Sequence, residues 1–277
     1  MNAPLGIFDS GLGGLTVAAA LREALPHENL VYLGDTARVP YGTRSPATIV
    51  RYARNNVAFL KKQGVKLVVV ACNTVSAQGL DGLTDGGDVP VIGVIRPGAR
   101  AAIQASAGGT IAVLGTPGTI RSGAYVQALH ELDPEREVLQ IACPLFVPLV
   151  EEGWVDHAVT LMVAREYLGA LRGKGVDTVI LGCTHYPLLE RTIGAVATEV
   201  LGHPVRLVDS AHAVARDVAA LLTRLRIARV PGPGDEAAGS RRFCVTDAPD
   251  RVDDVASRFW GGAVPRMEHV DVMSVPG

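Results

Sequence analysis

Two cysteines stand at equivalent places in this sequence, each where an apolar run ends and a polar turn begins. Cys72 follows the run 67–71, and Cys183 follows the run 178–182. Runs of this length that are rich in β-branched residues are typical of strands covered on both faces, and ligands bind parallel sheets at the carboxyl ends of such strands. The N-terminus of a following helix lowers the pKa of a thiol and favours the thiolate. We therefore expect two reactive thiols that face one substrate from opposite sides.

Polar residues follow each of these cysteines. Asn73 and Thr74 come after the first, and Thr184 and His185 come after the second. Asn and Thr commonly cap helices, which is a purely structural interpretation, but the free N–H groups of the same turn also bind carboxylates. A lone histidine is usually structural, whereas one beside a thiol at a strand end can tune that thiol or exchange a proton with it. His185 is therefore predicted to be catalytic.

The other two cysteines lack such neighbours. Cys143 precedes a proline and Cys244 lies inside a strand-like run, so both are interpreted as small buried hydrophobic residues. The sequence contains no Cys-x-x-Cys pair, which disfavours both thioredoxin-like redox chemistry and a structural zinc site. Four cysteines in a chain of this type are better interpreted as thiols than as a disulfide framework. We expect no metal and no cofactor.

A glycine-rich turn at 9–14 follows the first strand-like run. The turn resembles a phosphate-binding or dinucleotide-binding loop, and Asp35 follows it at a sequence spacing suitable for binding a ribose. The third glycine of that motif is missing, because its position holds Thr16. We favour a tight bend that presents Asp9 and Ser10 to a cleft. A non-catalytic nucleotide-binding regulator remains the alternative from a different functional class.

Strand-like runs alternate with helical patterns along the chain. The runs lie at 5–8, 30–33, 67–71, 91–95 and 110–114, with helical patterns at 15–25 and 46–62. This alternation predicts an α/β fold with parallel sheets wrapped by helices. After 96–98 the pattern starts again, and each half carries one of the two cysteine runs. We therefore predict two similar parallel-sheet α/β domains related by a pseudo-twofold axis, with the active site in the cleft between them.

The first domain is predicted to be discontinuous. It comprises residues 1–96 plus 208–277, and the second domain comprises 97–207. The C-terminal part is expected to pack back on the first domain. It contains a turn-rich linker at 230–239, a strand at 242–246, a helix at 250–259 and a closing strand at 266–272.

Composition narrows the class of protein. The chain has 277 residues, enough for two domains of ordinary size. Its 26 basic residues against 28 acidic ones give a net charge of −2, which offers no strong field for nucleic acid or an anionic membrane. Neither a signal-peptide pattern nor an apolar run of membrane-spanning length is present. We expect a cytoplasmic protein with no nucleic-acid or membrane partner.

Four motifs in this order together resemble a known family. They are Asp9–Thr16, Gly34–Gly42, Ala71–Thr74 and Leu181–Leu188. By itself the second motif is compatible with an ordinary connection that turns at Pro40. Taken together, from about Gly6 to Asp209, the sequence resembles the glutamate racemases. The resemblance implies a cofactor-independent isomerase of two α/β domains that makes D-glutamate for bacterial peptidoglycan and cell-wall synthesis.

The resemblance also implies residue roles. Cys72 and Cys183 would be the two acid/base residues, with Asp9 assisting the first and His185 the second. The implied substrate contacts are Asp9, Ser10, Tyr41, Gly42, Asn73, Thr74, Thr184 and His185, to which Thr116 and Glu151 are added as candidates. The sequence departs from the family pattern at Arg96, where an acidic residue is more common, so we expect a difference at an interdomain or subunit contact. The expected assembly is a homodimer.

The implied chemistry explains the need for two thiols. Racemisation removes the α-proton from one face of an amino acid and returns a proton to the other, so one sulfur starts as thiolate and the other as thiol. Preorganised donors around the carboxylate must stabilise the developing carbanion, and Asn73, Thr74 and Thr184 are the candidates. The nearest alternative is an aspartate racemase or another two-cysteine member of the same superfamily, which would differ in the length of its substrate.

Overall fold

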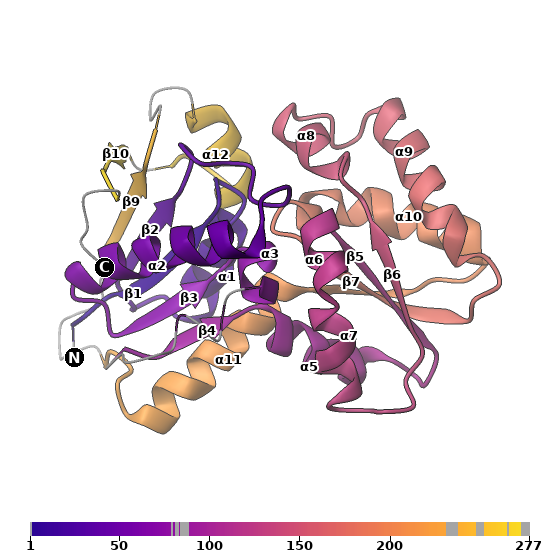
Figure 1. Ribbon diagram of the computed structural model, residues 1–277, viewed down its shortest axis with the longest axis horizontal. Coiled ribbons are helices and arrows are strands. Elements are labelled where there is room, and N and C mark those ends of the chain that lie inside the picture. Colours follow the sequence, from indigo (N-terminus) through magenta and orange to yellow (C-terminus); the bar gives the residue numbers. More distant parts are fainter. Residues whose placement is uncertain are drawn as a thin grey trace.

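The computed structural model describes residues 2–78, 80, 83, 89–230, 238–247, 252–264 and 266–272. Two parallel sheets lie side by side, each with helices packed around it (Figure 1). The larger sheet has the strand order β10-β9-β2-β1-β3-β4, and the smaller has the order β6-β5-β7-β8. We call the two parts built on these sheets the first half and the second half. The predicted α/β fold with two parallel sheets is confirmed.

The first half is built on buried strands. β1, β2 and β3 are buried along their whole length, which explains their continuous runs of Val, Ile and Leu. Its strands are β1 (Leu5–Asp9), β2 (Leu30–Gly34), β3 (Leu67–Val70), β4 (Val91–Gly93), β9 (Arg241–Val245) and β10 (Met267–His269). The helices are α1 (Leu15–Ala24), α2 (Pro46–Lys62), α3 (Asn73–Gln78) and α12 (Asp253–Trp260).

The second half repeats this plan with a smaller sheet. Its strands are β5 (Thr110–Gly115), β6 (Val138–Ala142), β7 (Val176–Gly182) and β8 (Arg206–Asp209). Its α-helices are α5 (Ile95–Ala105), α6 (Pro117–Ser122), α7 (Ala124–His130), α8 (Phe146–Glu151), α9 (Ala158–Leu168) and α10 (Glu190–Leu201). Two short 3₁₀ helices, η1 (Gly169–Leu171) and η2 (Tyr186–Leu189), complete it. The chain then returns through α11 (Ser210–Leu225), which packs against α1 under the first half (Figure 1).

The predicted domain limits of 1–96 plus 208–277 and 97–207 stay a prediction. The limit at 207/208 falls inside β8, whose residues pair with β7. In the C-terminal part, the predicted strand at 266–272 is shorter, because only 267–269 pair with β9. The predicted helix at 250–259 begins at Asp253, and its first two predicted residues lie outside the described residues. Most of the predicted linker, 231–237, also lies outside them.

The fourth strand is shorter than predicted as well. β4 ends at Gly93, and Ile95 begins α5 instead of ending the strand. The backbone at Gly93 lies against Ser76, where an added Cβ would come within 2.8 Å of the hydroxyl oxygen. That oxygen accepts the N–H of Val94 at 3.3 Å. A side chain of α3 therefore holds the N–H of the first residue after the strand, and β3, with which β4 pairs, also ends here, at Val70.

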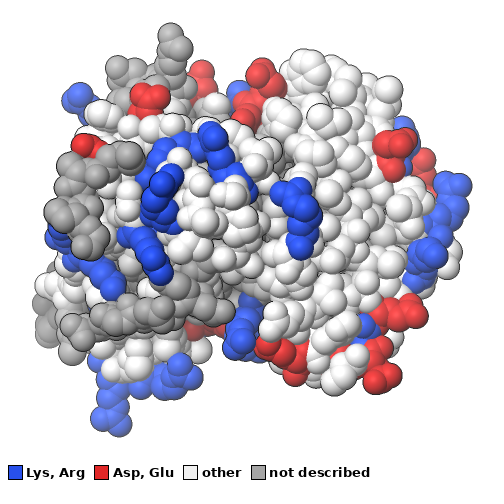
Figure 2. Space-filling view, viewed as in Figure 1, with Lys and Arg blue, Asp and Glu red and all other residues white. Residues whose placement is uncertain are grey.

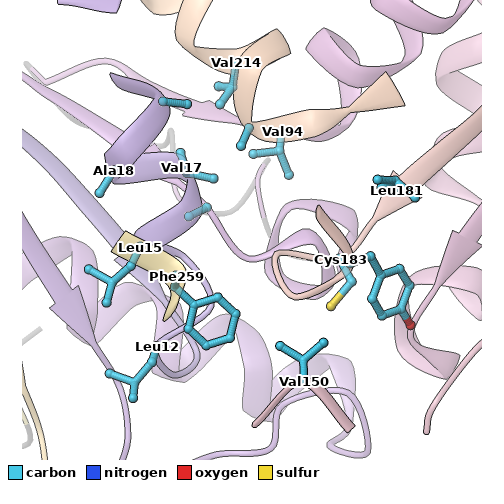
Figure 3. Packing of buried hydrophobic residues seen from close by; sticks show 14 of the residues in the cluster. Leu12, Leu15, Val17, Ala18, Val94, Val150, Leu181, Cys183, Val214 and Phe259 are labelled. Carbon is cyan, nitrogen blue, oxygen red and sulfur yellow. The ribbon is translucent and has the colours of Figure 1, made fainter. Parts of the chain in front are cut away.

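A shared apolar core joins the two halves. One buried cluster contains residues of both sheets and of α12 (Figure 3). In that view Cys183 lies beside Val150 of the second half, with Phe259 of α12 close by. Full burial of a side chain such as Phe259 contributes roughly 1.5–3 kcal/mol. The halves are therefore held by packing as well as by chain connections.

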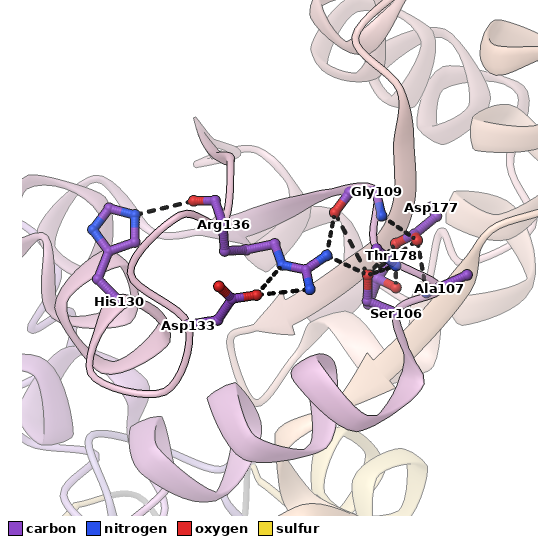
Figure 4. A network of polar contacts seen from close by, with 9 residues as sticks. Ser106, Ala107, Gly109, His130, Asp133, Arg136, Asp177 and Thr178 are labelled. Atoms are coloured by element: carbon purple, nitrogen blue, oxygen red, sulfur yellow. Dashed lines mark hydrogen bonds and ion pairs between the residues drawn. The ribbon is translucent and has the colours of Figure 1, made fainter.

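A polar network fixes the amino ends of the strands in the second half (Figure 4). The carboxylate of Asp177 accepts the N–H groups of Ala107 and Gly109, each at 2.8 Å. Partial burial alone would raise the pKa of this carboxyl, but its hydrogen bonds outweigh that effect and lower the pKa. Arg136 donates to the carbonyl of Gly109 at 2.8 Å and pairs with Asp133. This network lies at the edge of the sheet opposite the carboxyl ends of its strands. Its role is therefore to stabilise the sheet.

The described surface carries both signs of charge. Figure 2 shows basic side chains scattered over the face of the first half and both signs along the outer edge of the second. Among the residues described, no helix combines the length and apolar character that crossing a membrane requires.

Candidate active site

The carboxyl edges of the two sheets enclose a cavity of about 400 Å³. Cys72 and Cys183 both line it, and each side chain is only 6% exposed. Of the other predicted site residues, those that also line it are Ser10, Tyr41, Gly42, Asn73, Thr74, Thr116, Glu151, Thr184 and His185. Asp9 lies behind this lining. The structure therefore brings together residues of four sequence motifs that lie far apart in the chain.

Cys72 sits in the turn between β3 and α3. Its thiol donates to the hydroxyl oxygen of Ser10 at 3.5 Å. Burial raises the pKa of this thiol to about 12, and the nearby carboxylate of Asp9 adds to the increase. The expected low pKa is therefore wrong for Cys72. A backbone N–H of α3, from Val75, does lower the pKa, but burial and the neighbouring negative charge of Asp9 outweigh it.

Asp9 ends β1 directly behind the first cysteine. Its Oδ2 accepts the N–H of Gly11 at 3.0 Å, while its Oδ1 is buried without a hydrogen-bond partner in the described part of the chain. Burial raises the pKa of this carboxyl, against the opposing effect of His185. Gly14 is required beside it, because an added Cβ would lie 2.5 Å from the Asp9 Cβ. Asp9 thus combines a raised proton affinity with a position near Cys72.

The second cysteine has a different set of neighbours. The Sγ of Cys183 lies 3.9 Å from Nδ1 of His185, and Nε2 of His185 lies 3.0 Å from Oε1 of Glu151. Burial alone would lower the pKa of His185, but its hydrogen bonds to Cys183 and Glu151 outweigh this and raise the pKa to about 10. The Phe259 ring packs against the imidazole in a T-shaped arrangement, with centroids 4.9 Å apart. His185 is therefore held between this sulfur and the Glu151 carboxylate, and its raised pKa favours the protonated imidazole.

The glycine turn of the first half touches the turn of the second cysteine. A Cβ at Gly13 would lie 2.3 Å from Oγ1 of Thr184 and 2.5 Å from Nδ1 of His185. The hydroxyl of Thr16 donates to the carbonyl of Thr184 at 3.2 Å. Thr16 is the residue that breaks the dinucleotide motif. The turn therefore brings the two halves into contact.

Asp35 is not available for the ribose contact that the nucleotide alternative requires. Its side chain is fully buried, forms an ion pair with Arg38 at 2.6 Å, and accepts the Nδ2 hydrogen of Asn56 at 3.2 Å and the hydroxyl of Tyr41. Thr246 also donates to it at 3.1 Å. These contacts fix the loop that carries Tyr41 to the cavity. Because its oxygens are already engaged by these neighbours, the Asp35 side chain does not support a nucleotide site.

Two threonines meet across the cavity. Oγ1 of Thr74, in the first half, lies 2.9 Å from Oγ1 of Thr116, which caps α6 in the second half. Gln78 donates to the carbonyl of Gly118 at 2.9 Å in the same region. Both threonines therefore hold the halves together in addition to lining the cavity.

Comparison with known proteins agrees with this arrangement. The Asp/Glu/Hydantoin racemase family model matches residues 15–218. The chain belongs to this family. A protein from Geobacter metallireducens named glutamate racemase is 51% identical over 93% of each chain. The crystal structure of glutamate racemase from Francisella tularensis in complex with D-glutamate has a TM-score of 0.89, 36% identity and 99% coverage of both chains.

A third relative has the same fold. Glutamate racemase isoform RacE1 from Bacillus anthracis has a TM-score of 0.88, 39% identity and 97% coverage of both chains. The resemblance to glutamate racemases that the four motifs indicate is thus confirmed. The prediction of an isomerase is confirmed at the level of the family.

Several residues around the site in this family member were not found by sequence reasoning. Asn56 carries a usable signal, because it interrupts the apolar face of α2 and is fully buried. Tyr125, Phe259 and the contact between Glu151 and His185 carry none, because they depend on how distant segments pack. Arg96, where the family pattern is broken, forms an exposed ion pair with Glu131 at 3.3 Å. That pair lies within the second half, and the predicted subunit contact stays a prediction.

The cavity offers no obvious set of metal ligands. Its described lining provides thiols, hydroxyls, an amide, one carboxylate and one imidazole, and it includes no lysine. Within the described ranges, no group of three or more His, Cys, Asp or Glu side chains could hold a metal ion.

Proposed function

We propose that this chain interconverts L- and D-glutamate by a two-thiol acid/base mechanism. The observation that carries the proposal is that Cys72 and Cys183 line one cavity from the carboxyl edges of two separate sheets. Two fixed groups on opposite sides of a bound α-carbon can remove a proton from one face and supply one to the other. The names of the relatives support glutamate as the substrate.

The different neighbours of Cys72 and Cys183 give each thiol its own starting protonation state. Nδ1 of His185 lies 3.9 Å from Sγ of Cys183, so the imidazole is placed to take the thiol proton and to stabilise the sulfur anion by its charge. The raised pKa of Cys72 keeps that residue as a thiol. The Cys183 thiolate then removes the α-proton from one face, and Cys72 donates its proton to the other. The opposite enantiomer starts from the reverse pair of protonation states, which Asp9 and His185 help to restore by proton exchange.

The carbanion needs stabilisation from the cavity wall. The hydroxyls of Ser10, Thr74 and Thr184 and the amide of Asn73 supply donors around the substrate carboxylate and amino group. Tyr41, Gly42 and Thr116 complete the substrate contacts. Enclosure between the two halves strengthens these interactions by excluding water. No cofactor takes part in the proposal, because both proton transfers use side chains of the chain itself.

The wider role follows from the product. We propose a cytoplasmic homodimer that supplies D-glutamate for peptidoglycan synthesis. Its two domains, 1–96 with 208–277 and 97–207, would separate to admit substrate and close for reaction.

Chiral chromatography of glutamate after incubation with the protein tests the proposal. Wild-type protein should racemise both enantiomers, whereas Cys72→Ser and Cys183→Ser should each abolish racemisation. α-Proton exchange in deuterated water would separate one-sided exchange from inversion. Full racemisation by either variant would overturn the two-thiol mechanism. Faster turnover of aspartate than of glutamate would instead assign the chain to the aspartate-specific alternative.

A further inference from the structure

We propose that Tyr125 is a positioning residue that fixes the spacing between the two cysteines. The proposal rests on the two-thiol function above. Tyr125 lies on α7 in the second half and contacts the residue after Cys72 and the residue before Cys183. It lies outside the cavity lining and touches no reacting atom, so its effect would pass through those neighbours.

The hydroxyl of Tyr125 makes the first contact. It donates to Oδ1 of Asn73 at 2.7 Å, and Nδ2 of Asn73 donates to Oγ of Ser210 at 3.5 Å. All three side chains are buried. Burial raises the pKa of Tyr125 well above its usual range, so the hydroxyl stays protonated and remains a donor. Asn73 begins α3 directly after Cys72, so this hydrogen bond ties the first cysteine turn to the second half.

The ring of Tyr125 makes the second contact. A Cβ added at Gly182 would lie 3.1 Å from Cε2 of the ring, and one added at Gly98 would lie 3.2 Å from the hydroxyl oxygen. Glycine at both positions therefore lets the ring fit closely between α5 and the end of β7. Gly182 is the last residue of β7, and Cys183 follows it. The ring thus supports the backbone from which the second cysteine projects.

One rigid side chain therefore spans the distance between the two cysteine turns. Loss of the hydroxyl would leave the buried Oδ1 of Asn73 without its 2.7 Å partner and free the amide to reorient. The ring would still support Gly182. Displacement of a reacting group by about 1 Å can cost on the order of a hundredfold in rate. A small shift of Cys72 relative to Cys183 would impair inversion more than proton removal by one thiol.

The test compares Tyr125→Phe with Tyr167→Phe. The hydroxyl of Tyr167 accepts the N–H of Leu145 at 3.1 Å, a contact confined to the second half. Racemisation of each enantiomer, thermal unfolding and early α-deuteration in deuterated water are measured for both variants. Tyr125→Phe should lower kcat on the order of tenfold in both directions. It should also raise the ratio of deuterated product with retained configuration to product with inverted configuration. Tyr167→Phe should match the wild type in both measurements.

A second measurement does not depend on activity. The rates at which iodoacetamide labels Cys72 and Cys183 are followed by mass spectrometry, and Tyr125→Phe should increase the rate at Cys72. If Tyr125→Phe lowers only the unfolding temperature, with kcat, the deuteration ratio and labelling as in Tyr167→Phe, its role is structural and the inference is overturned. If the wild type itself fails to racemise glutamate, the proposed function fails, and the labelling rates alone decide whether Tyr125 positions the thiol.

Discussion

His185 and Glu151 form an ion pair at the second cysteine, with Nε2 of His185 3.0 Å from Oε1 of Glu151. Arg258 of α12 donates to the backbone carbonyl of Glu151 at 2.7 Å and so helps to hold that residue in place. The pair leaves Nδ1 facing Cys183 at 3.9 Å. The two thiols therefore differ in their neighbours, with an imidazole of raised pKa beside Cys183 and the carboxyl group of Asp9 near Cys72.

Glu151→Gln should shift the pH dependence of racemisation. Wild-type His185 has a pKa raised from 6.5 to about 10, partly through its hydrogen bond to Glu151. Removing the carboxylate charge lowers that pKa, so the imidazolium is lost at a lower pH. The alkaline limb of the kcat/KM profile should move toward acid, with activity near neutrality reduced less than activity at pH 9. Identical profiles for variant and wild type would show that Glu151 does not tune His185.

The thiols should react at different rates with iodoacetamide. Burial and Asp9 raise the pKa of Cys72 to about 12, so only a small fraction of this side chain is thiolate at pH 8. Labelling followed by mass spectrometry should modify Cys183 before Cys72. Asp9→Asn removes the negative charge and should increase the rate at Cys72. Cys143 and Cys244, both fully buried, serve as internal controls that stay unlabelled. Labelling of Cys72 first would contradict the assigned starting states.

Gly13→Ala should sharply reduce turnover. The new methyl group would lie 2.3 Å from Oγ1 of Thr184 and 2.5 Å from Nδ1 of His185, so the second cysteine turn must move. A displacement of this kind is expected to lower kcat by on the order of a hundredfold. Gly169→Ala is the matched control, because nothing lies within 4 Å of its added Cβ. Steady-state kinetics of both variants, with circular dichroism to verify folding, would measure the effect. A normal kcat in a folded Gly13→Ala variant would show that the close fit of Gly13 against Thr184 and His185 is not needed for turnover.

The sequence was sufficient to predict the fold class and the meeting of the two cysteines. Both follow from buried β-branched runs and from the rule that parallel strands present their carboxyl ends at one edge. The pKa of Cys72 could not be predicted, because it depends on burial and on the distance to Asp9. The role of Asp35 was hidden for a similar reason, since Arg38, Asn56 and Thr246 meet it only in the folded chain.

Asp35→Asn should destabilise the protein and weaken substrate binding together. The substitution removes the charge of a fully buried carboxylate that pairs with the largely buried Arg38 and holds Tyr41, and removing one partner of a buried pair typically costs about 3–5 kcal/mol. Because the loop 34–42 carries Tyr41 to the cavity, KM should rise more than kcat falls. Urea unfolding and steady-state kinetics measure the two effects. Glu199→Gln, which breaks an exposed pair with Arg165, is the control and should leave both unchanged. If Asp35→Asn were as stable as this control, with an unchanged KM, the Asp35 contacts would not be what holds the loop at the cavity.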